Sequence, residues 1–593
     1  MFYRIIVFLL FSSIGYAQNS ELANRYFFQG EYDKAAVLYK NLYEKNKIRR
    51  VYFKQLLSCY QLTNKFEQAT ALVHSHQEAF PNQPYINIEI GYNLQLQGDK
   101  EGAIPYYEKA LKSIEKNPPS GYLIGSTFTD NHLLDYALKT YQRAMELDPN
   151  LNYHSYIAVI YGEKAEIENM FNTYLNMIEK NENYFATVQR YVGRFVTDDD
   201  SDEHNILFRK LILKRLQGNP IASWNKLLSW LYMQQKDFGK ALTQEIALHK
   251  RQETNLSRVT QLGIIAFNNQ DYPTSRQGFT YILDHTKDPY LILEANLYLL
   301  KSAAALAKTP SEITAVNLKF EEILGVYEYS PATVEIQIAY ADFLTFKKDE
   351  PTQAAELLKE TLGKTSTDLQ RGYVKMKLAD ILVYRNKFNE ALVNYSQIQT
   401  QLKNSTLAQT ARYKVAQTSY FKGDFKWAMT QLKVLKKSTS QLIANDALQL
   451  HLLISDNIVG DTIHDALKSY AKADLLAFQN KHTAAIDTLS GLLKRFRGRS
   501  IEDEALYKRA ELYTKEGQYE LAEADYLALI ELNQEDILVD DAYYHLGDLY
   551  EHHLNDVEKA KEMYQKILFD FSSSIYLVDA RKRFRTLRGD VIK

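Results

Sequence analysis

Residues 517–529 read GQYELAEADYLAL, and the same arrangement stands near the start of the chain as GEYDKAAVLYKNL at residues 30–42. Both segments open with a glycine and then place an aromatic residue, an alanine and a tyrosine at identical spacing. Apolar residues at three- and four-residue intervals after a glycine predict a turn followed by an amphipathic helix. A pattern written at both ends of a chain indicates internal repeats, and repeats determine the architecture.

The repeat period is 34 residues in the N-terminal part of the chain, where Ala35, Ala69, Ala103 and Ala137 recur at that interval. Small or apolar residues also recur upstream of each alanine, which predicts two closely packed helices in each repeat. One such pair cannot bury its apolar face alone, so the pairs must stack. The positions expected to pack inside the repeats are Ala35, Tyr39, Ala69, Ala103, Tyr107, Ala137, Tyr141, Ala241, Ala391, Tyr395, Ala428, Ala485, Ala522, Tyr526, Ala560 and Tyr564.

These small residues, tyrosines and alanines at a 34-residue period resemble tetratricopeptide repeats. The resemblance extends over most of the chain, although copies are hard to align at residues 183–225 and 290–370. It implies an all-α fold, a right-handed α-solenoid or superhelix of helical hairpins, whose first helices line a concave groove. In this family the groove holds a peptide or a helix of a partner protein.

The sequence divides into four parts. Residues 1–17 carry Arg4, a short apolar run and small residues before Gln18, which is typical of a secretory signal peptide. Residues 18–182 are expected to form an N-terminal repeat array. Residues 183–370 are expected to form a divergent helical-repeat region with an acidic linker near 197–205. Residues 371–593 are expected to form a C-terminal array that ends in a basic capping helix.

The composition is that of a foldable, mostly helical chain. Hydrophobic residues make up 46% and charged residues 24%, and glycine and proline number 23 and 12 among 593 residues. A net charge of −2 gives no reason to expect nucleic acid as a partner. The single cysteine, Cys59, cannot form an internal disulfide, so an exported chain of this kind depends on packing for its stability.

Two segments in the last third of the chain have a further resemblance. LLKRFRGRSIEDEALY (492–507) and ILFDFSSSIYLVDARKRF (567–584) each run from an aromatic-ended helix through serine into an acidic helix start. They resemble repeats of exported bacterial envelope proteins, namely the helical-repeat lipoprotein of the barrel assembly machinery and the periplasmic coordinator of the Tol–Pal system. With the signal peptide, this implies a periplasmic scaffold, peripheral to the outer membrane, in envelope assembly, secretion or cell-wall processes. The chain lacks the lipobox of that lipoprotein.

Chemistry-bearing motifs are missing from the sequence. It contains no HExxH, GxSxG or Walker motif, and no GxGxxG after a strand. The run TDDDSDEHN (197–205) has Glu203 where a calcium loop needs glycine and leads to Arg209 where it needs glutamate. His545 and His552 could share a helix face but lack a convergent third ligand. We therefore expect no enzyme activity, no cofactor and no metal site, and a protein as the partner.

Two other functions stay open. Soluble lytic transglycosylases are exported and carry an α-superhelix, but the Glu-Ser pair and Gly-Leu-Met-Gln stretch of that family do not occur here. A muropeptide-release assay distinguishes that enzyme class. A purely structural spacer is the other interpretation, and it predicts that no partner co-purifies.

A basic segment ends the chain. Its residues are Arg581, Lys582, Arg583, Arg585 and Arg588, in the expected final helix. Cations near a helix C-terminus interact favourably with the helix dipole, so a solvated capping helix explains them. The alternative is a contact with anionic lipid or with an acidic partner.

Overall fold

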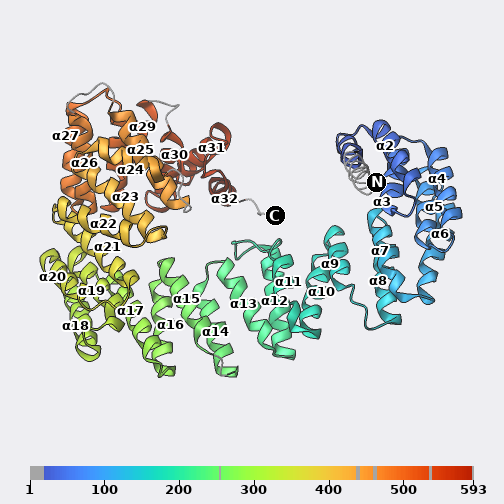
Figure 1. Ribbon diagram of the computed structural model, residues 1–593, viewed down its shortest axis with the longest axis horizontal. Helices are drawn as coiled ribbons and strands as arrows, with labels where there is room; N and C mark the ends of the chain where they lie inside the picture. The colour runs from blue at the N-terminus through green and yellow to red at the C-terminus, as the bar shows by residue number, and fades with distance from the viewer. Residues whose placement is uncertain (1–18, 253–254, 436–440, 459–463, 533–536, 590–593) are drawn as a thin grey trace, which may run out of the picture. The chain divides into compact units, whose positions relative to one another are not determined.

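The computed structural model describes residues 19–252, 255–435, 441–458, 464–532 and 537–589. Within these ranges the chain is helical and contains no strand, which confirms the all-α prediction. The chain divides into two compact units, Met1–Gln235 and Lys236–Lys593 (Figure 1). The boundary between them falls inside residues 183–370, the region in which repeats are hard to align.

Helices account for nearly all of the described part of the N-terminal unit. They are residues 19–28, α2 (Tyr32–Lys45), α3 (Arg50–Leu62), α4 (Phe66–Ala79), α5 (Tyr85–Leu96), α6 (Lys100–Lys112), η1 (Ser113–Glu115), η2 (Pro118–Ser120), α7 (Gly121–Asp130), α8 (Leu134–Leu147), α9 (His154–Glu163), α10 (Ile167–Lys180), η3 (Glu182–Tyr184), α11 (Phe185–Val192), α12 (Glu203–Gly218) and α13 (Ala222–Gln234).

The C-terminal unit continues in the same way. Its helices are α14 (Phe238–Gln252), α15 (Ser257–Asn268), α16 (Tyr272–His285), α17 (Pro289–Leu306), α18 (Pro310–Tyr327), η4 (Pro331–Thr333), α19 (Val334–Phe346), α20 (Pro351–Leu362), α21 (Asp368–Tyr384), α22 (Phe388–Gln401), α23 (Thr406–Phe421), α24 (Phe425–Leu435), α25 (Gln441–Asn457), α26 (Asp465–Phe478), α27 (His482–Arg495), α28 (Glu502–Lys515), α29 (Tyr519–Leu532), α30 (Val539–His552), α31 (Val557–Asp570) and α32 (Leu577–Arg588).

Helices that follow one another along the chain also contact one another, so within each unit the hairpins stack in chain order (Figure 1). Each repeat therefore packs mainly on its neighbours, which makes each unit an α-solenoid. The acidic residues near 197–205 are partly helical, because α12 begins at Glu203 and the Asp202 carboxylate caps it by accepting hydrogen bonds from the amides of His204 and Asn205.

A small residue on the first helix of a hairpin faces an aromatic ring on the second. A Cβ added to Gly91 would lie 2.6 Å from the ring of Tyr107, and one added to Gly263 would lie 2.9 Å from the ring of Phe279. Both pairs are separated by 16 residues, so the same geometry recurs where the sequence places a small residue 16 positions before an aromatic one. The ring occupies the space that a larger first-helix side chain would need.

The turns inside the first hairpins have a left-handed residue at a repeating position. In the N-terminal array these residues are Gly30, Asn64, Gly98 and His132, 34 positions apart, with φ between 54° and 95°. At the last of these turns the amide of Leu133 donates to the carbonyl of Phe128 over 2.8 Å, which satisfies a carbonyl at the helix end. Glycine and asparagine tolerate this conformation best, which explains the Gly-Asp and Asn-Lys dipeptides between the helices.

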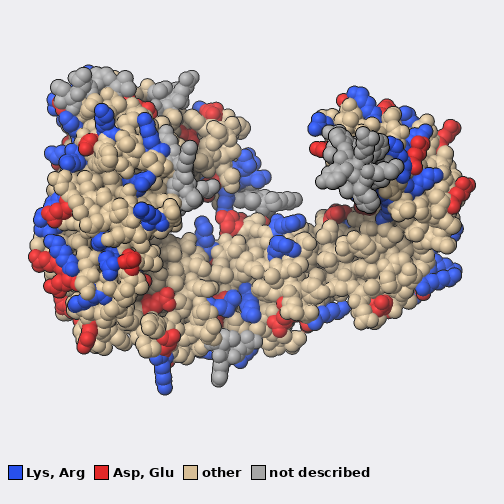
Figure 2. Space-filling model, viewed as in Figure 1, with Lys and Arg blue, Asp and Glu red and all other residues tan. Residues whose placement is uncertain are grey.

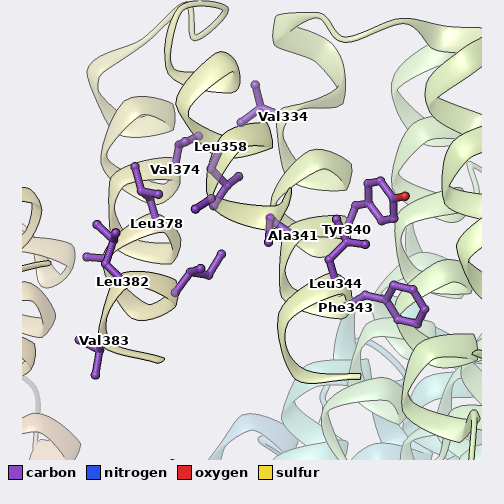
Figure 3. Close-up of a cluster of buried hydrophobic side chains, with 14 of the residues drawn as sticks. Val334, Tyr340, Ala341, Phe343, Leu344, Leu358, Val374, Leu378, Leu382 and Val383 are labelled. Atoms are coloured by element: carbon purple, nitrogen blue, oxygen red, sulfur yellow. The ribbon is translucent and has the colours of Figure 1, made fainter. Parts of the chain in front are cut away.

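The buried side chains of the C-terminal unit form successive hydrophobic clusters along its helices. Around α19, Tyr340 and Phe343 project on one side, whereas Ala341 lies on the other side, toward Leu358 of α20 (Figure 3). The ring of Phe320 in α18 lies 5.0 Å from that of Tyr340, in a stacked arrangement. Aromatic rings thus fill the space between hairpins as well as the space beside the small residues within them.

One helix departs from the alternation of first and second helices. Helix α25 follows the hairpin α23/α24, and α26 then packs on α23 as well as on α25. Because α26 contacts the preceding first helix directly, α25 is an insertion beside the stack. It becomes part of the wall of the groove described next.

Candidate functional site

A groove of about 1360 Å³ lies within the C-terminal unit. Its lining comes from the first helices α23, α26, α28 and α30 and from the inserted helix α25. Residues 498–500 before α28 and 537–538 before α30 also contribute. First helices of successive hairpins thus present a common surface. A cavity of this volume is large enough for several side chains of a bound segment.

Helix α28 contributes a stripe of side chains to the groove. The stripe consists of Glu504, Tyr507, Lys508, Glu511 and Lys515, at helical spacings of three and four residues. The opposite face of the helix carries the buried Ala505, Ala510 and Leu512. Two faces of one helix therefore have separate roles, because one packs in the solenoid and the other lines the groove.

A polar network crosses the floor of the groove from α23 to α28. The hydroxyl of Tyr420 donates to Oδ2 of Asp474 over 2.9 Å, and Nζ of Lys508 lies 3.6 Å from Oδ1 of the same carboxylate. Lys508 also lies 3.4 Å from Oε2 of Glu511. Burial raises the pKa of Asp474, and the Lys508 ammonium opposes this shift. The groove floor is therefore polar, partly desolvated and internally paired.

Helix α25 closes one side of the groove and meets α28 through a hydrogen bond. Nδ2 of Asn457 donates to Oε1 of Glu504 over 2.9 Å, while Oε2 of Glu504 is buried without a hydrogen-bond partner. Burial, followed by the neighbouring Asp503 carboxylate, raises the pKa of Glu504 to about 9. Glu504 is consequently protonated at neutral pH.

Acidic side chains outnumber cationic ones in the groove. Its described lining includes eight acidic side chains and three cationic ones. The acidic residues are Asp446, Asp456, Asp474, Glu502, Asp503, Glu504, Glu511 and Asp541. Over the face shown in Figure 2, by contrast, basic and acidic side chains are interspersed on both units, in line with a net charge of −2.

A second, more apolar depression of about 690 Å³ lies among α15, α17, α19 and α21 of the same unit. The side chain of Lys301 lines it, and burial lowers the pKa of that ammonium. Lys377 in its wall forms an ion pair with Asp342 at 2.5 Å. First helices line this depression too, so the inner surface of the unit is hollowed at more than one place.

The sixteen residues expected to pack inside the repeats are all buried, with at most 2% of each side chain exposed. They are Ala35, Tyr39, Ala69, Ala103, Tyr107, Ala137, Tyr141, Ala241, Ala391, Tyr395, Ala428, Ala485, Ala522, Tyr526, Ala560 and Tyr564. Cys59 is also buried, and burial raises the pKa of its thiol to about 12, so the thiol is protonated and unreactive at neutral pH.

The basic C-terminal residues do not form one group. Arg583 lies on the packed side of α32, where its guanidinium contacts Asp548 at 2.7 Å, Asp579 at 2.8 Å and Glu551 at 3.2 Å. The pairs with Asp548 and Glu551 join α32 to α30, so Arg583 takes part in the packing of the capping helix. The alternative, a contact of the basic segment with an anionic partner, stays a prediction. Arg581, Arg585 and Arg588 are exposed, whereas Lys582 is half-buried like Arg583.

The histidines and acidic runs do not converge on a metal site. No group of three or more histidine, cysteine, aspartate or glutamate side chains in the described ranges could hold a metal ion. His545 stacks on Tyr526 and lines the groove, whereas His552 is exposed. No helix in the described part of the chain is long and apolar enough to cross a membrane.

Sequence reasoning missed the groove carboxylates. Asp446 and Asp456 stand on α25 and Glu511 stands on α28, and it is the insertion of α25 that brings these segments together. The stripe on α28 is recognisable in the sequence as polar residues at helical spacing, and this spacing could have predicted a solvent-facing surface on that helix. The contribution of α25 to the groove could not be predicted, because this helix does not follow the repeat pattern.

Comparison with known families supports the repeat assignment in both units. Residues 85–117, 470–537 and 541–574 match family models described as tetratricopeptide repeat. No curated relative matches the chain.

Solved structures with a similar fold align over most of the chain. One, the structure of Naa15/Naa10 bound to HypK-THB, is 11% identical over 97% of this chain and 97% of that chain, with a TM-score of 0.31. Another, the crystal structure of yeast Tom70, is 13% identical over 96% of this chain and 99% of that chain, with a TM-score of 0.28. From the three family matches we conclude that the chain carries tetratricopeptide repeats in both of its compact units.

Proposed function

We propose that this protein is an exported, periplasmic scaffold that binds a segment of a partner protein in the groove of its C-terminal unit. The observation that carries the proposal is the 1360 Å³ groove lined by first helices of successive repeats. Tetratricopeptide repeats and the solenoid architecture support a role in protein–protein interaction. The residues that line the groove are placed by packing and ion pairs, so the surface is preorganised for a partner.

The cellular process in this proposal is envelope assembly, secretion or cell-wall work. The resemblance of residues 492–507 and 567–584 to envelope repeat proteins supports it, together with the expected signal peptide, which lies at residues 1–17, outside the described residues. A lytic enzyme is the alternative. The groove has buried carboxyls with raised pKa, which such chemistry uses, but the motifs of that family are missing from the sequence.

Site-specific photocrosslinking in intact cells tests the scaffold. A photoreactive amino acid is placed at Leu452, which lines the groove, or at Leu527, which lies on second helix α29 outside it. The two leucines are a matched pair, because each has 38% of its side chain exposed. We expect a crosslinked protein at Leu452 and none at Leu527. Equal crosslinking at both positions, or at neither, would contradict a partner held in the groove.

A peripheral contact with a membrane is a second proposal, and the end of the chain supports it. Ile575 and Val578 are exposed beside the basic residues of α32. Apolar and cationic side chains on one helix suit an anionic lipid surface. Vesicles containing anionic lipid should bind the purified protein, and the binding should weaken as salt rises. Replacement of Arg581 and Arg585 with glutamate should abolish it, and binding indifferent to salt or to these changes would exclude the contact.

A further inference from the structure

We infer that the groove of the C-terminal unit selects a partner segment that carries lysine or arginine side chains with apolar residues between them. This inference rests on the proposed function and specifies the chemistry of the partner. Three observations carry it: the charge of the groove lining, the exposed apolar side chains at its edge, and the shortage of internal cations to neutralise its carboxylates.

The carboxylates of the groove come from different helices. Asp446 and Asp456 are exposed on α25, and Glu511 stands on α28. Asp541 on α30 extends the acidic lining and accepts a hydrogen bond of 2.8 Å from the hydroxyl of Tyr576. A cationic side chain that enters the groove meets carboxylates from several helices, which favours lysine or arginine over a neutral or acidic residue.

The cations already in the groove do not neutralise it. Lys508 is held between Asp474 and Glu511 on the floor. Arg499 and Lys515 are the other two cationic side chains of the described lining. Burial keeps the pKa of Asp474, Glu504 and Asp541 above the ordinary range of carboxyl groups. Glu504 is protonated at neutral pH and adds no charge. The attraction for an added cation therefore comes from the other seven acidic side chains of the described lining, which still outnumber its three cationic ones.

Apolar side chains at the edge of the groove define the rest of the partner. Ile537 has 71% of its side chain exposed, and Leu532 and Leu452 are exposed as well. The rings of Tyr413 and Tyr507 lie among the carboxylates. Apolar residues left in water at a concave surface mark a site for apolar contacts. Tyrosine rings also offer a face to a cationic side chain.

A peptide selection on the purified protein tests this chemistry. Twelve-residue peptides displayed on phage are selected against the full chain, and the strongest sequences are synthesised and measured by fluorescence anisotropy. We expect enrichment of peptides with a net positive charge and with apolar residues between the cations. Their affinity should fall as salt rises, because screening weakens exposed charge pairs.

Two triple variants give a matched comparison. D446N/D456N/E511Q removes three groove carboxylates, and D487N/D570N/E520Q removes three carboxylates from second helices α27, α31 and α29. Each variant changes net charge by the same amount. We expect the groove variant to weaken the selected peptides at least tenfold, which corresponds to about 1.4 kcal/mol, and the control variant to weaken them less than twofold.

Several results would overturn the inference. Enrichment of neutral or acidic peptides that the groove variant still weakens would refute the charge preference but leave the scaffold in place. Peptides equally bound by the groove variant, or no enrichment at all, would refute the inference at this groove. If either of these results is found and Leu452 also gives no crosslinked partner, the proposed function is refuted as well. Self-association that the groove variant abolishes would assign the groove to a second copy of the chain and also overturn the inference.

Discussion

Gly125 on α7 lies directly against the ring of Tyr141 on α8, so closely that a Cβ on the glycine would stand 2.5 Å from Cε1 and Cζ of the tyrosine. Tyr141 is buried, and the space beside it exists because residue 125 has no side chain. The same relationship holds between Gly547 and Tyr564, near the other end of the chain. This contact explains the small residues that recur upstream of the repeated tyrosines.

Gly125→Ala should destabilise the N-terminal unit. Alanine normally stabilises a helix interior by about 0.5–1 kcal/mol relative to glycine. At this position the methyl group overlaps the ring of Tyr141, and overpacking typically costs about 1–3 kcal/mol. Chemical denaturation should therefore show a net loss of stability.

Gly491→Ala is the control for this prediction. Gly491 lies inside α27, and a Cβ added there meets nothing within 4 Å. That variant should be neutral or more stable than the natural protein. If Gly125→Ala changes the stability no more than Gly491→Ala does, the contact between the small residue and the aromatic ring does not determine the hairpin geometry.

Ala165→Gly should stabilise the protein. Ala165 occupies the turn between α9 and α10 with φ of 58°, where a Cβ costs about 1–2 kcal/mol. Glycine removes that cost and should raise the midpoint of thermal unfolding. The converse change, Gly98→Ala, places a side chain at φ of 95° and should lower the midpoint. Effects of the same sign in both variants would refute the assignment of strain to these turns.

Much of this fold was predictable from the sequence, because its determinants are local. The 34-residue spacing of Ala35, Ala69, Ala103 and Ala137 gives the hairpin stack, and every one of these alanines is buried. The Gly-Asp and Asn-Lys dipeptides predict where the first helix of a hairpin ends. The extra helix α25 could not be predicted as part of a site, because its position depends on packing against α24 and α23 after the repeat has been interrupted.

The groove was only partly predictable for the same reason. Tyr507, Lys508 and Glu511 share a helix face in any helix of this sequence. That Asp474 lies 3.6 Å from Lys508 depends on the stacking of α26 on α28, and no local rule gives the distance. In the same way, the sequence does not distinguish Arg583 from the four other cationic residues of the last helix. Its role in packing depends on tertiary contacts with Asp548 and Glu551.

Glu504→Gln should stabilise the protein at high pH and have little effect at low pH. The pKa of Glu504 is about 9 in the folded protein and its ordinary value is 4.5. A carboxyl with a raised pKa contributes fully to stability below its unfolded pKa, and that contribution is lost as the pH rises from 4.5 through about 9. Glutamine keeps an acceptor for Asn457 and cannot ionise.

The difference in stability between Glu504→Gln and the natural protein should therefore be near zero at pH 4.5 and on the order of 5 kcal/mol at pH 8.5, because each pKa unit corresponds to about 1.4 kcal/mol. Denaturant midpoints at the two pH values measure it. Glu520→Gln, on the exposed side of α29, serves as the control and should show no such trend. A difference that is constant with pH would mean that Glu504 ionises normally.

Replacement of Leu9 and Leu10 with arginine should block export. These residues lie in the apolar run of the expected signal peptide, outside the described residues. Charged residues disrupt the apolar segment that a signal peptide needs. The precursor should then accumulate in the cytoplasm, as fractionation and N-terminal sequencing would show. Normal processing to a chain that starts at Gln18 would contradict the proposed location.

Amide hydrogen exchange with and without the partner captured at Leu452 is the most direct test of the central claim, that first helices of the C-terminal unit form the binding surface. On binding, exchange should slow in α23, α25, α26 and α28, which line the groove, and should stay unchanged in the second helices α22 and α27. Protection confined to the second helices, or to the N-terminal unit with none in the groove, would contradict the account.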